Sequence, residues 1–163
     1  MKSKAARANC LDASALVKLY VKENGSEILN QYFRDEATRY ATPICFYEAL
    51  SVLKVKWLYR KEISRDEYLS ASFSMTAWFS VSSHVLKDID FLSPYVFRDV
   101  RSIAERHSLD VSDAFQILSV RDGYFSGLMD DSRTVLVTAD EALAEAARDE
   151  GVQTWYILKE PPP

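Results

Sequence analysis

The chain has 163 residues, of which 48% are hydrophobic and 27% charged, a balance typical of a globular domain rather than a disordered or fibrous chain. No stretch approaches the roughly 18 apolar residues that a membrane span needs, so we expect a soluble, cytoplasmic protein. With two cysteines, two histidines and a formal net charge of −4, the chain lacks a disulfide framework, zinc-ligand spacing and the overall basicity of many nucleic-acid binders.

The first half of the chain predicts short strands that alternate with helices. Pro43 suits the first turn of a helix, and Ser64 with Glu67 matches a capping box. In chain order, the expected elements are a strand at Asn9–Asp12, a helical stretch from Ser14 with a second piece from Ser26 to about Glu36, a weak strand at Tyr40–Thr42, a helix from Pro43 to about Arg60 and a helix from Ser64 to about Ser80.

The second half continues the alternation. The continuous apolar run Val135–Val137 is typical of a parallel strand buried on both faces, and Gly151 suits the end of a helix. In chain order, we expect a strand near Val85–Phe91, a helix from Ser93 to about His107, a helix from Ser112, the strand Val135–Val137, a helix from about Glu141 to Glu150 and a strand at Thr154–Leu158. This pattern predicts an α/β protein, a three-layer α/β/α sandwich with a mainly parallel central sheet.

Three acidic residues stand where such a sheet places its functional sites, outside the carboxyl ends of the strands. Asp12 ends the first strand, and Asp140 follows the strand at 135–138 after one intervening residue. Asp113 lies in the first turn of the helix expected from Ser112, where the helix dipole favours a carboxylate. The three side chains therefore share one expected location.

A fourth acid, Glu48, lies on the apolar face of the helix that begins at Pro43. Its neighbours on that face are Ile44, four residues before it, and Val52, four residues after it. An ionised carboxylate without a partner is costly at such a position, by several kcal/mol. We therefore expect a basic residue, a proton or a metal ion to compensate Glu48.

Each acid also has an ordinary structural interpretation. Asp12, Asp113 and Asp140 are suited to cap a helix or to occupy its first turn, and Glu48 is suited to pair with a buried arginine or lysine. Asp110, three residues before Asp113, is suited to a loop or to the same site. Structural roles for all four acids at once would require four independent reasons, which favours a shared site.

Carboxylates that gather in one place repel one another, which raises their pKa values and favours a bound cation. Mg²⁺ and Mn²⁺ prefer oxygen ligands and suit a group of carboxylates without His or Cys. One or two such ions beside a phosphodiester support its hydrolysis by water, without a covalent intermediate.

The motifs around these acids resemble those of PIN-domain ribonucleases, and most closely the VapC-type toxins of toxin–antitoxin pairs. The similarity covers nearly the whole chain in the right order. It is carried by Leu11-Asp12-Ala13-Ser14-Ala15-Leu16-Val17, Tyr47-Glu48-Ala49-Leu50-Ser51-Val52-Leu53, Leu109-Asp110-Val111-Ser112-Asp113-Ala114, Val137-Thr138-Ala139-Asp140-Glu141-Ala142-Leu143, Ala146-Ala147 and Gly151-Val152. Two stretches depart from the family pattern: 6–11 is less apolar than usual, and 115–119 lacks the common small residues.

The resemblance implies a single PIN-like domain over residues 1–160, followed by a short proline tail at 161–163. It implies that Asp12, Glu48, Asp113 and Asp140 are catalytic and hold Mg²⁺ or Mn²⁺, and that the hydroxyls of Ser14 and Thr138 support them. It also implies endoribonuclease activity on RNA, a homodimer and silencing by a cognate antitoxin protein whose tail covers the cleft.

A basic and aromatic stretch follows Glu48. Lys54, Lys56, Arg60 and Lys61, interleaved with aromatic residues, suit contact with RNA phosphates, and an ordinary solvated helix face explains them equally well. Two other functions remain open. One is a metal- or partner-binding module without turnover. The other is a receiver-like domain that accepts a phosphoryl group, which would need a lysine at a late strand end, where the chain has Lys159.

Overall fold

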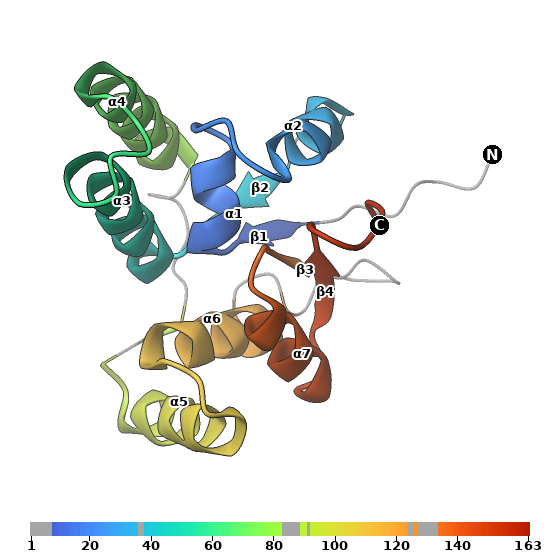
Figure 1. Ribbon diagram of the computed structural model, residues 1–163. Helices are drawn as coiled ribbons and strands as arrows, with labels where there is room; N and C mark the ends of the chain where they lie inside the picture. Colours follow the sequence, from blue (N-terminus) through green and yellow to red (C-terminus); the bar gives the residue numbers. More distant parts are fainter. Residues whose placement is uncertain (1–7, 36–37, 83–88, 91, 124–125, 127–133) are drawn as a thin grey trace.

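A parallel β-sheet organises the part of the chain that the computed structural model describes, which is residues 8–35, 38–82, 89–90, 92–123, 126 and 134–163. Its strands are β1 (Asn9–Leu11), β2 (Arg39–Tyr40), β3 (Val135–Thr138) and β4 (Gln153–Tyr156). They lie in the order β2-β1-β3-β4, and all three pairings are parallel (Figure 1). Because all strands run the same way, their carboxyl ends meet at one edge of the sheet.

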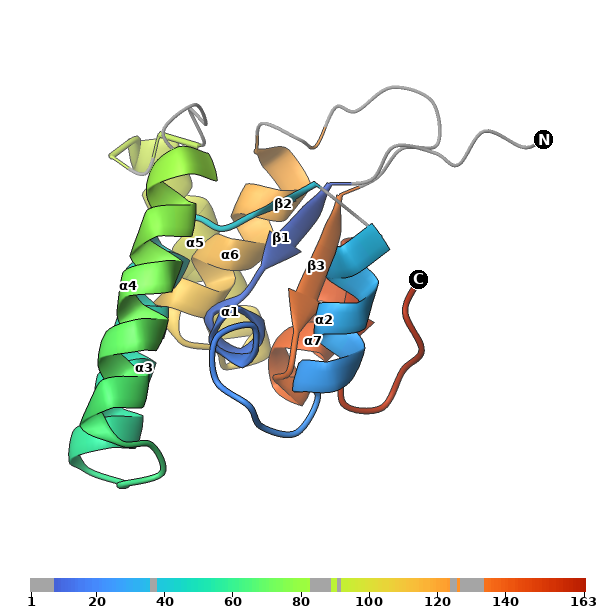
Figure 2. The same cartoon turned by 90° about the horizontal axis from the view of Figure 1, so that it is seen from above.

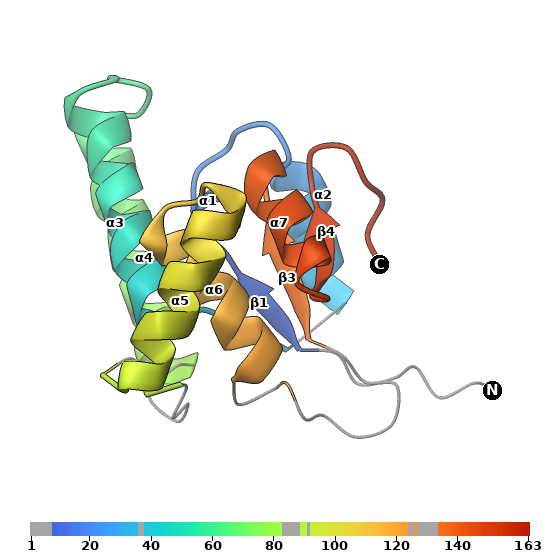
Figure 3. The same cartoon turned by 90° about the horizontal axis from the view of Figure 1, so that it is seen from below.

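Helices cover both faces of this sheet. Figure 2 shows α1 and α2 over one face with the α3–α4 hairpin beside them, and Figure 3 shows α5, α6 and α7 over the other. The helices are α1 (Ala13–Lys18), α2 (Ser26–Asp35), α3 (Pro43–Leu58), α4 (Arg65–Ser82), α5 (Pro94–His107), α6 (Val111–Asp122) and α7 (Glu141–Asp149). The result is the three-layer α/β/α architecture expected from the sequence.

Alternate strand residues build two separate cores. Leu11, Val137 and Trp155 pack with α1–α4 on one face, whereas Cys10 and Leu136 pack with α5–α7 on the other. This alternation follows from the period of two residues in a strand. Strand β3 is buried on both faces, which explains its continuous apolar run Val135–Val137.

The helix ends follow the signals in the sequence. The Thr42 side chain accepts a hydrogen bond from the Cys45 amide and caps α3, which begins at Pro43. At the start of α4, the Ser64 amide donates to the Glu67 carboxylate and the Glu67 amide donates to the Ser64 hydroxyl, as a capping box requires. Gly151 follows α7 with φ +79°, a conformation that favours glycine.

The structure confirms the expected fold class and most of the element bounds within a few residues. The strand expected at Val85–Phe91 falls almost wholly outside the described residues, and Ile89 and Asp90 are not in a strand. Helix α6 begins at Val111 with Asp110 as its N-cap, one residue earlier than expected. None of the described helices is both long and apolar enough to span a bilayer.

The two departures from the family pattern have local explanations. The side chain of Asn9 is fully buried in β1, where it donates to the Thr38 carbonyl and accepts from the Tyr32 hydroxyl. In α6, every residue from Ala114 to Val120 is buried, with α5 packed against the helix. The larger side chains of this helix therefore form core and do not disturb the fold.

Candidate metal centre

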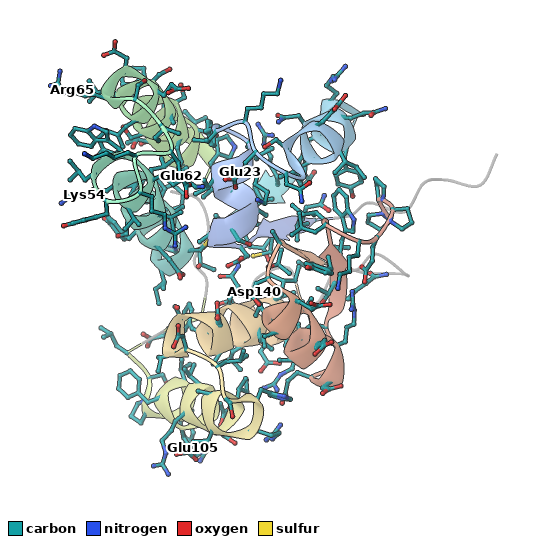
Figure 4. The ribbon with its side chains drawn as sticks, in the orientation of Figure 1. Glu23, Lys54, Glu62, Arg65, Glu105 and Asp140 are labelled. Carbon is teal, nitrogen blue, oxygen red and sulfur yellow. The ribbon has the colours of Figure 1, made fainter. Side chains whose placement is uncertain are left out.

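The acids singled out in the sequence line one cleft of about 270 Å³. The cleft lies at the edge where the carboxyl ends of β1 and β3 meet the first turns of α1, α6 and α7. Asp140 is labelled there in Figure 4. The carboxylates that line the cleft come from segments far apart in the sequence: Asp12, Glu48, Asp110, Asp113 and Asp140, with Glu23 at its outer part.

Asp12 is the most deeply placed of these acids, with 5% of its surface exposed. It is the N-cap of α1, and its Oδ2 accepts from the Ser14 amide at 3.1 Å. The same oxygen accepts from the Ser14 hydroxyl at 2.5 Å and from the Thr138 hydroxyl at 3.0 Å. Three bonds to one oxygen fix the direction of the carboxylate.

The two hydroxyls also join β1 to the loop that follows β3. The Ala139 amide donates to the Ser14 hydroxyl at 2.9 Å, and the Asp140 amide donates to the Thr138 hydroxyl at 2.9 Å. Each hydroxyl thus accepts from a backbone amide and donates to Asp12. Ser14 and Thr138 therefore hold the Asp12 carboxylate in place.

Helix starts position three further acids. Asp140 is the N-cap of α7, and its Oδ1 accepts from the Leu143 amide at 3.0 Å. Asp113 is in the first turn of α6, and Asp110 is the N-cap residue of that helix without a side-chain capping bond. The partial positive charge of a helix start favours carboxylates here. These capping positions are structural roles that coexist with a place in the cleft.

Glu48 reaches the cleft from the side of α3. The carboxylate is half-buried, and the side chain of Ser112 hydrogen-bonds to it. Ser112 belongs to α6, so this contact connects two helices across the cleft. Within the described residues, Glu48 forms no ion pair with a lysine, arginine or histidine. A basic residue therefore does not compensate its charge there.

The electrostatics of the cleft are those of like charges held close together. Burial, followed by the charges of Asp12, Glu48, Asp140 and Asp110, raises the pKa of Asp113 from 3.8 to about 7. Burial and the charge of Asp12 also raise the pKa of Glu48, with a smaller contribution from Asp110. Burial raises the pKa of Asp12 against the opposing effect of its hydrogen bonds. A proton or a cation therefore stabilises this cleft.

A buried polar network forms the floor beneath the acids. The Thr42 hydroxyl donates to the Gln116 carbonyl at 3.0 Å, and the Gln116 amide donates to the Cys10 sulfur at 2.9 Å. The Cys45 thiol donates to the Leu11 carbonyl at 2.9 Å, and burial raises its pKa well above its ordinary value. Both cysteines are buried and form no disulfide with each other, so they are core residues.

The donor set suits a hard divalent cation, and its geometry is open. The lining of the cleft offers several carboxylates and, among the described residues, no His or Cys, and Mg²⁺ and Mn²⁺ prefer such oxygen ligands. Over the described ranges, no three His, Cys, Asp or Glu side chains are arranged to hold a metal ion. The carboxylates thus share a cleft without converging on one point, as expected for side chains that repel one another.

Comparison with known proteins gives the fold. No protein-family model matches the sequence. No curated protein matches it either. A crystal structure of PAE2754 from Pyrobaculum aerophilum matches with a TM-score of 0.56, over 91% of this chain and 90% of that chain, at 23% sequence identity. The fold is PIN-like.

Within this PIN-like fold, the basic residues proposed for RNA contact differ in their surroundings. Lys54, Arg60 and Lys61 are exposed on the outer part of α3 and the turn after it; Lys54 is labelled in Figure 4. Lys56 is different, because its ammonium pairs with Glu23 at 2.6 Å and with Glu62 at 2.7 Å, and its side chain is 12% exposed. The charge of Lys56 is therefore engaged within the protein, and contact of these four basic residues with RNA stays a prediction.

Several residues of the cleft were not selected from the sequence. For Asp110 the sequence leaves a loop and the site both open; in the structure it lines the cleft and raises the pKa of both Glu48 and Asp113. The spacing of three residues between Asp110 and Asp113 is the sequence signal that both side chains face the same site. Lys18 and Glu23 also line the cleft, although each reads as an ordinary surface charge in the sequence. Lys18 and Glu23 meet at the cleft because the loop after α1 folds back toward that helix.

Proposed function

We propose that this chain is a Mg²⁺- or Mn²⁺-dependent endoribonuclease that hydrolyses RNA phosphodiester bonds. The observation that carries the proposal is the meeting of Asp12, Glu48, Asp113 and Asp140 in one cleft, with no recorded ion pair to any of them among the described residues. The PIN-like fold and the resemblance of the motifs to PIN-domain ribonucleases support the choice of RNA.

The residues of the chain have distinct parts in this proposal. Asp12 would contribute a carboxylate that Ser14 and Thr138 already orient. Glu48 and Asp113, whose pKa values are raised by burial and by the neighbouring acids, would be held as carboxylates by a bound cation. Asp140 would complete the site from the start of α7. The divalent ion, when bound, supplies charge neutralisation at the phosphate and promotes ionisation of water.

The resemblance also supports a biological setting. We propose that the protein acts in the cytoplasm as the toxin of a toxin–antitoxin pair, forms a homodimer and is silenced by a cognate antitoxin protein. Size-exclusion chromatography with light scattering would test the dimer. Co-expression with the product of a neighbouring small gene that carries a DNA-binding domain would test the antitoxin.

A second function is a PIN-like module that binds a metal ion or a partner without turnover. The open arrangement of the acids favours this alternative, because no three of the described acidic, His or Cys side chains are arranged to hold a metal ion. A receiver-like phospho-acceptor is less well supported. Its required lysine, Lys159, is 63% exposed, pairs with Glu141 at 2.5 Å and is not among the residues that line the cleft.

Cleavage of a labelled single-stranded RNA separates the two main functions. The wild type should cleave it with Mg²⁺ or Mn²⁺ and not with EDTA, and Asp12→Asn and Asp113→Asn should each reduce the rate by at least about a hundredfold with the fold retained. Asp149→Asn, at the end of α7, is the matched control and should retain the full rate. Manganese binding measured by calorimetry without any RNA cleavage would favour the silent module.

A further inference from the structure

One cation lies among the carboxylates of the cleft. Lys18 is in the last turn of α1, and its side chain lines the cleft together with the acids. It is six residues after Asp12, which is about 9 Å along a helix axis. Asp12 and Lys18 therefore line the same cleft from opposite ends of the short helix α1. No other lysine or arginine lines this cleft within the described residues.

The position of this ammonium is fixed by an ion-pair chain. Lys18 Nζ donates to Glu23 Oε1 at 2.7 Å, and the second oxygen of Glu23 pairs with Lys56 at 2.6 Å. Lys56 pairs in turn with Glu62 at 2.7 Å. Figure 4 shows Glu23 beside α1, with Glu62 next to it on the side of the α3–α4 hairpin. The chain connects α1, the loop at 19–25 and the end of α3.

Glu23 is itself held by the loop. Its amide donates to the Ser26 hydroxyl at 3.0 Å, and that hydroxyl donates to the Val21 carbonyl at 2.9 Å. Burial raises the pKa of the Glu23 carboxyl, but hydrogen bonds and charges from Lys18 and Lys56 outweigh it and lower the pKa overall. Glu23 is thus ionised at neutral pH and keeps Lys18 in place.

The ammonium of Lys18 has unused capacity for a ligand. Its side chain is only 11% exposed, and an ammonium has three N–H donors. Among the described residues, Glu23 is the recorded partner of one of them. An ammonium on a side chain that is this little exposed, with N–H donors left over, is stabilised by an anion that enters the cleft. In the proposed function, the carboxylates of the cleft hold the divalent metal ion, so the anion that pairs with Lys18 would come from the substrate.

We propose that Lys18 binds a phosphate oxygen of the RNA strand in the cleft, as a positioning residue next to the carboxylates, an inference that rests on the proposed function. A lysine binds phosphate as a compact point charge. Because the acids repel a polyanion, a fixed cation in the lining of the same cleft offsets that repulsion. The alternative is that Lys18 serves only the ion pair with Glu23.

Breaking the ion pair from its two sides distinguishes these roles. Lys18→Met removes the cation, whereas Glu23→Gln removes the negative charge but keeps a side-chain oxygen that accepts a hydrogen bond from the Lys18 ammonium, so the cation stays in place. The phosphate role predicts that Lys18→Met weakens RNA binding by about tenfold and that Glu23→Gln leaves it unchanged or stronger. A purely structural ion pair predicts that both variants weaken it alike. Lys22→Met, at an exposed position in the same loop, is the control and should bind as the wild type does.

The binding assay is fluorescence anisotropy of a labelled single-stranded RNA in the presence of Ca²⁺, over a range of salt concentrations. One lost phosphate contact lowers the slope of log affinity against log salt by about 0.7, a readout that a structural role does not move. Lys18→Arg, which retains the charge, should restore most of the affinity. Calorimetry with Mn²⁺ should give Lys18→Met an affinity equal to or higher than that of the wild type, because a repelling charge is removed.

The outcomes separate this inference from the proposed function. If the wild type cleaves RNA and Lys18→Met binds RNA as tightly as the wild type, the role of Lys18 is wrong and the nuclease stands. If the wild type does not cleave RNA, the proposed function fails, and equal RNA affinity of wild type and Lys18→Met overturns the role of Lys18 as well. If Lys18→Met does not fold, Glu23→Gln decides: a tenfold loss of affinity overturns the inference, and full affinity supports it.

Discussion

Replacing Asp113 with asparagine should make the metal-free protein more stable, because the change removes a half-buried charge and its repulsion from the neighbouring acids. The pKa of Asp113 rises from 3.8 to about 7, which corresponds to at most about 4 kcal/mol of unfavourable free energy when the carboxyl is ionised. The cleft is open to solvent, and screening reduces this to about 1–2 kcal/mol. The expected increase in Tm is about 3–6 °C for a chain of this length.

The pH dependence gives the sign of the effect. The folded protein holds the Asp113 proton up to about pH 7, whereas the unfolded chain releases it near pH 3.8. Wild-type stability attributable to this group therefore falls as the pH rises between these values, and the asparagine variant lacks that fall. The advantage of the variant should be full at about pH 8 and less than half as large at about pH 5.

Thermal unfolding followed by circular dichroism in EDTA, at the two pH values, measures this difference. Glu27→Gln is a suitable control, since Glu27 is an acid in the first turn of α2. If Asp113 only complemented the dipole of α6, its replacement would lower stability by about 0.3–1 kcal/mol, as in the control. A lower Tm for Asp113→Asn at about pH 8 would refute the repulsion argument. Added Mg²⁺ should then raise the Tm of the wild type more than that of the variant.

Three further predictions test the surroundings of the acids. Ser14→Ala and Thr138→Val, which each remove a hydrogen bond to Asp12, should lower Mn²⁺ affinity by about tenfold and stability by about 1 kcal/mol; unchanged calorimetric titrations would show that these hydroxyls do not orient the site. The apparent Mg²⁺ affinity should rise by about tenfold from pH 6 to pH 8, because one proton must leave Asp113; a flat profile would contradict its raised pKa. Glu150→Gln, which leaves the cations of α5 and α6 without their shared carboxylate, should cost about 2 kcal/mol in urea unfolding and leave Mn²⁺ affinity unchanged; a loss of affinity would extend the site to the far end of α7.

The sequence was sufficient for the fold because its local signals agree with one another. The apolar run at 135–137, Pro43 at the start of α3 and the capping box at Ser64 each fixed an element close to its observed bounds. The start of α6 was misplaced by one residue because both Asp110 and Ser112 suit an N-cap. The spacing of acids at strand ends then placed most of the candidate site.

The rest of the site depends on tertiary contacts that local patterns do not contain. Lys56 was grouped with exposed basic residues because its helix position reads as solvated, yet the loop after α1 brings Glu23 against it. The same loop brings Lys18 into an ion pair at the cleft. Asp110, at the start of α6, raises the pKa of Glu48 because α3 approaches α6, and sequence spacing does not reveal this approach. Long-range approach, rather than residue type, decided these three cases.

Mutually repelling carboxylates from separate segments are proposed here to become a metal site when a divalent cation enters the cleft. Anomalous scattering from crystals grown or soaked with Mn²⁺ shows directly whether such an ion binds. We expect a manganese peak in the cleft, bonded to Asp12 and to at least one of Glu48 and Asp113, with the carboxylates drawn toward it. Well-ordered crystals at saturating Mn²⁺ that show no peak between these side chains would contradict it.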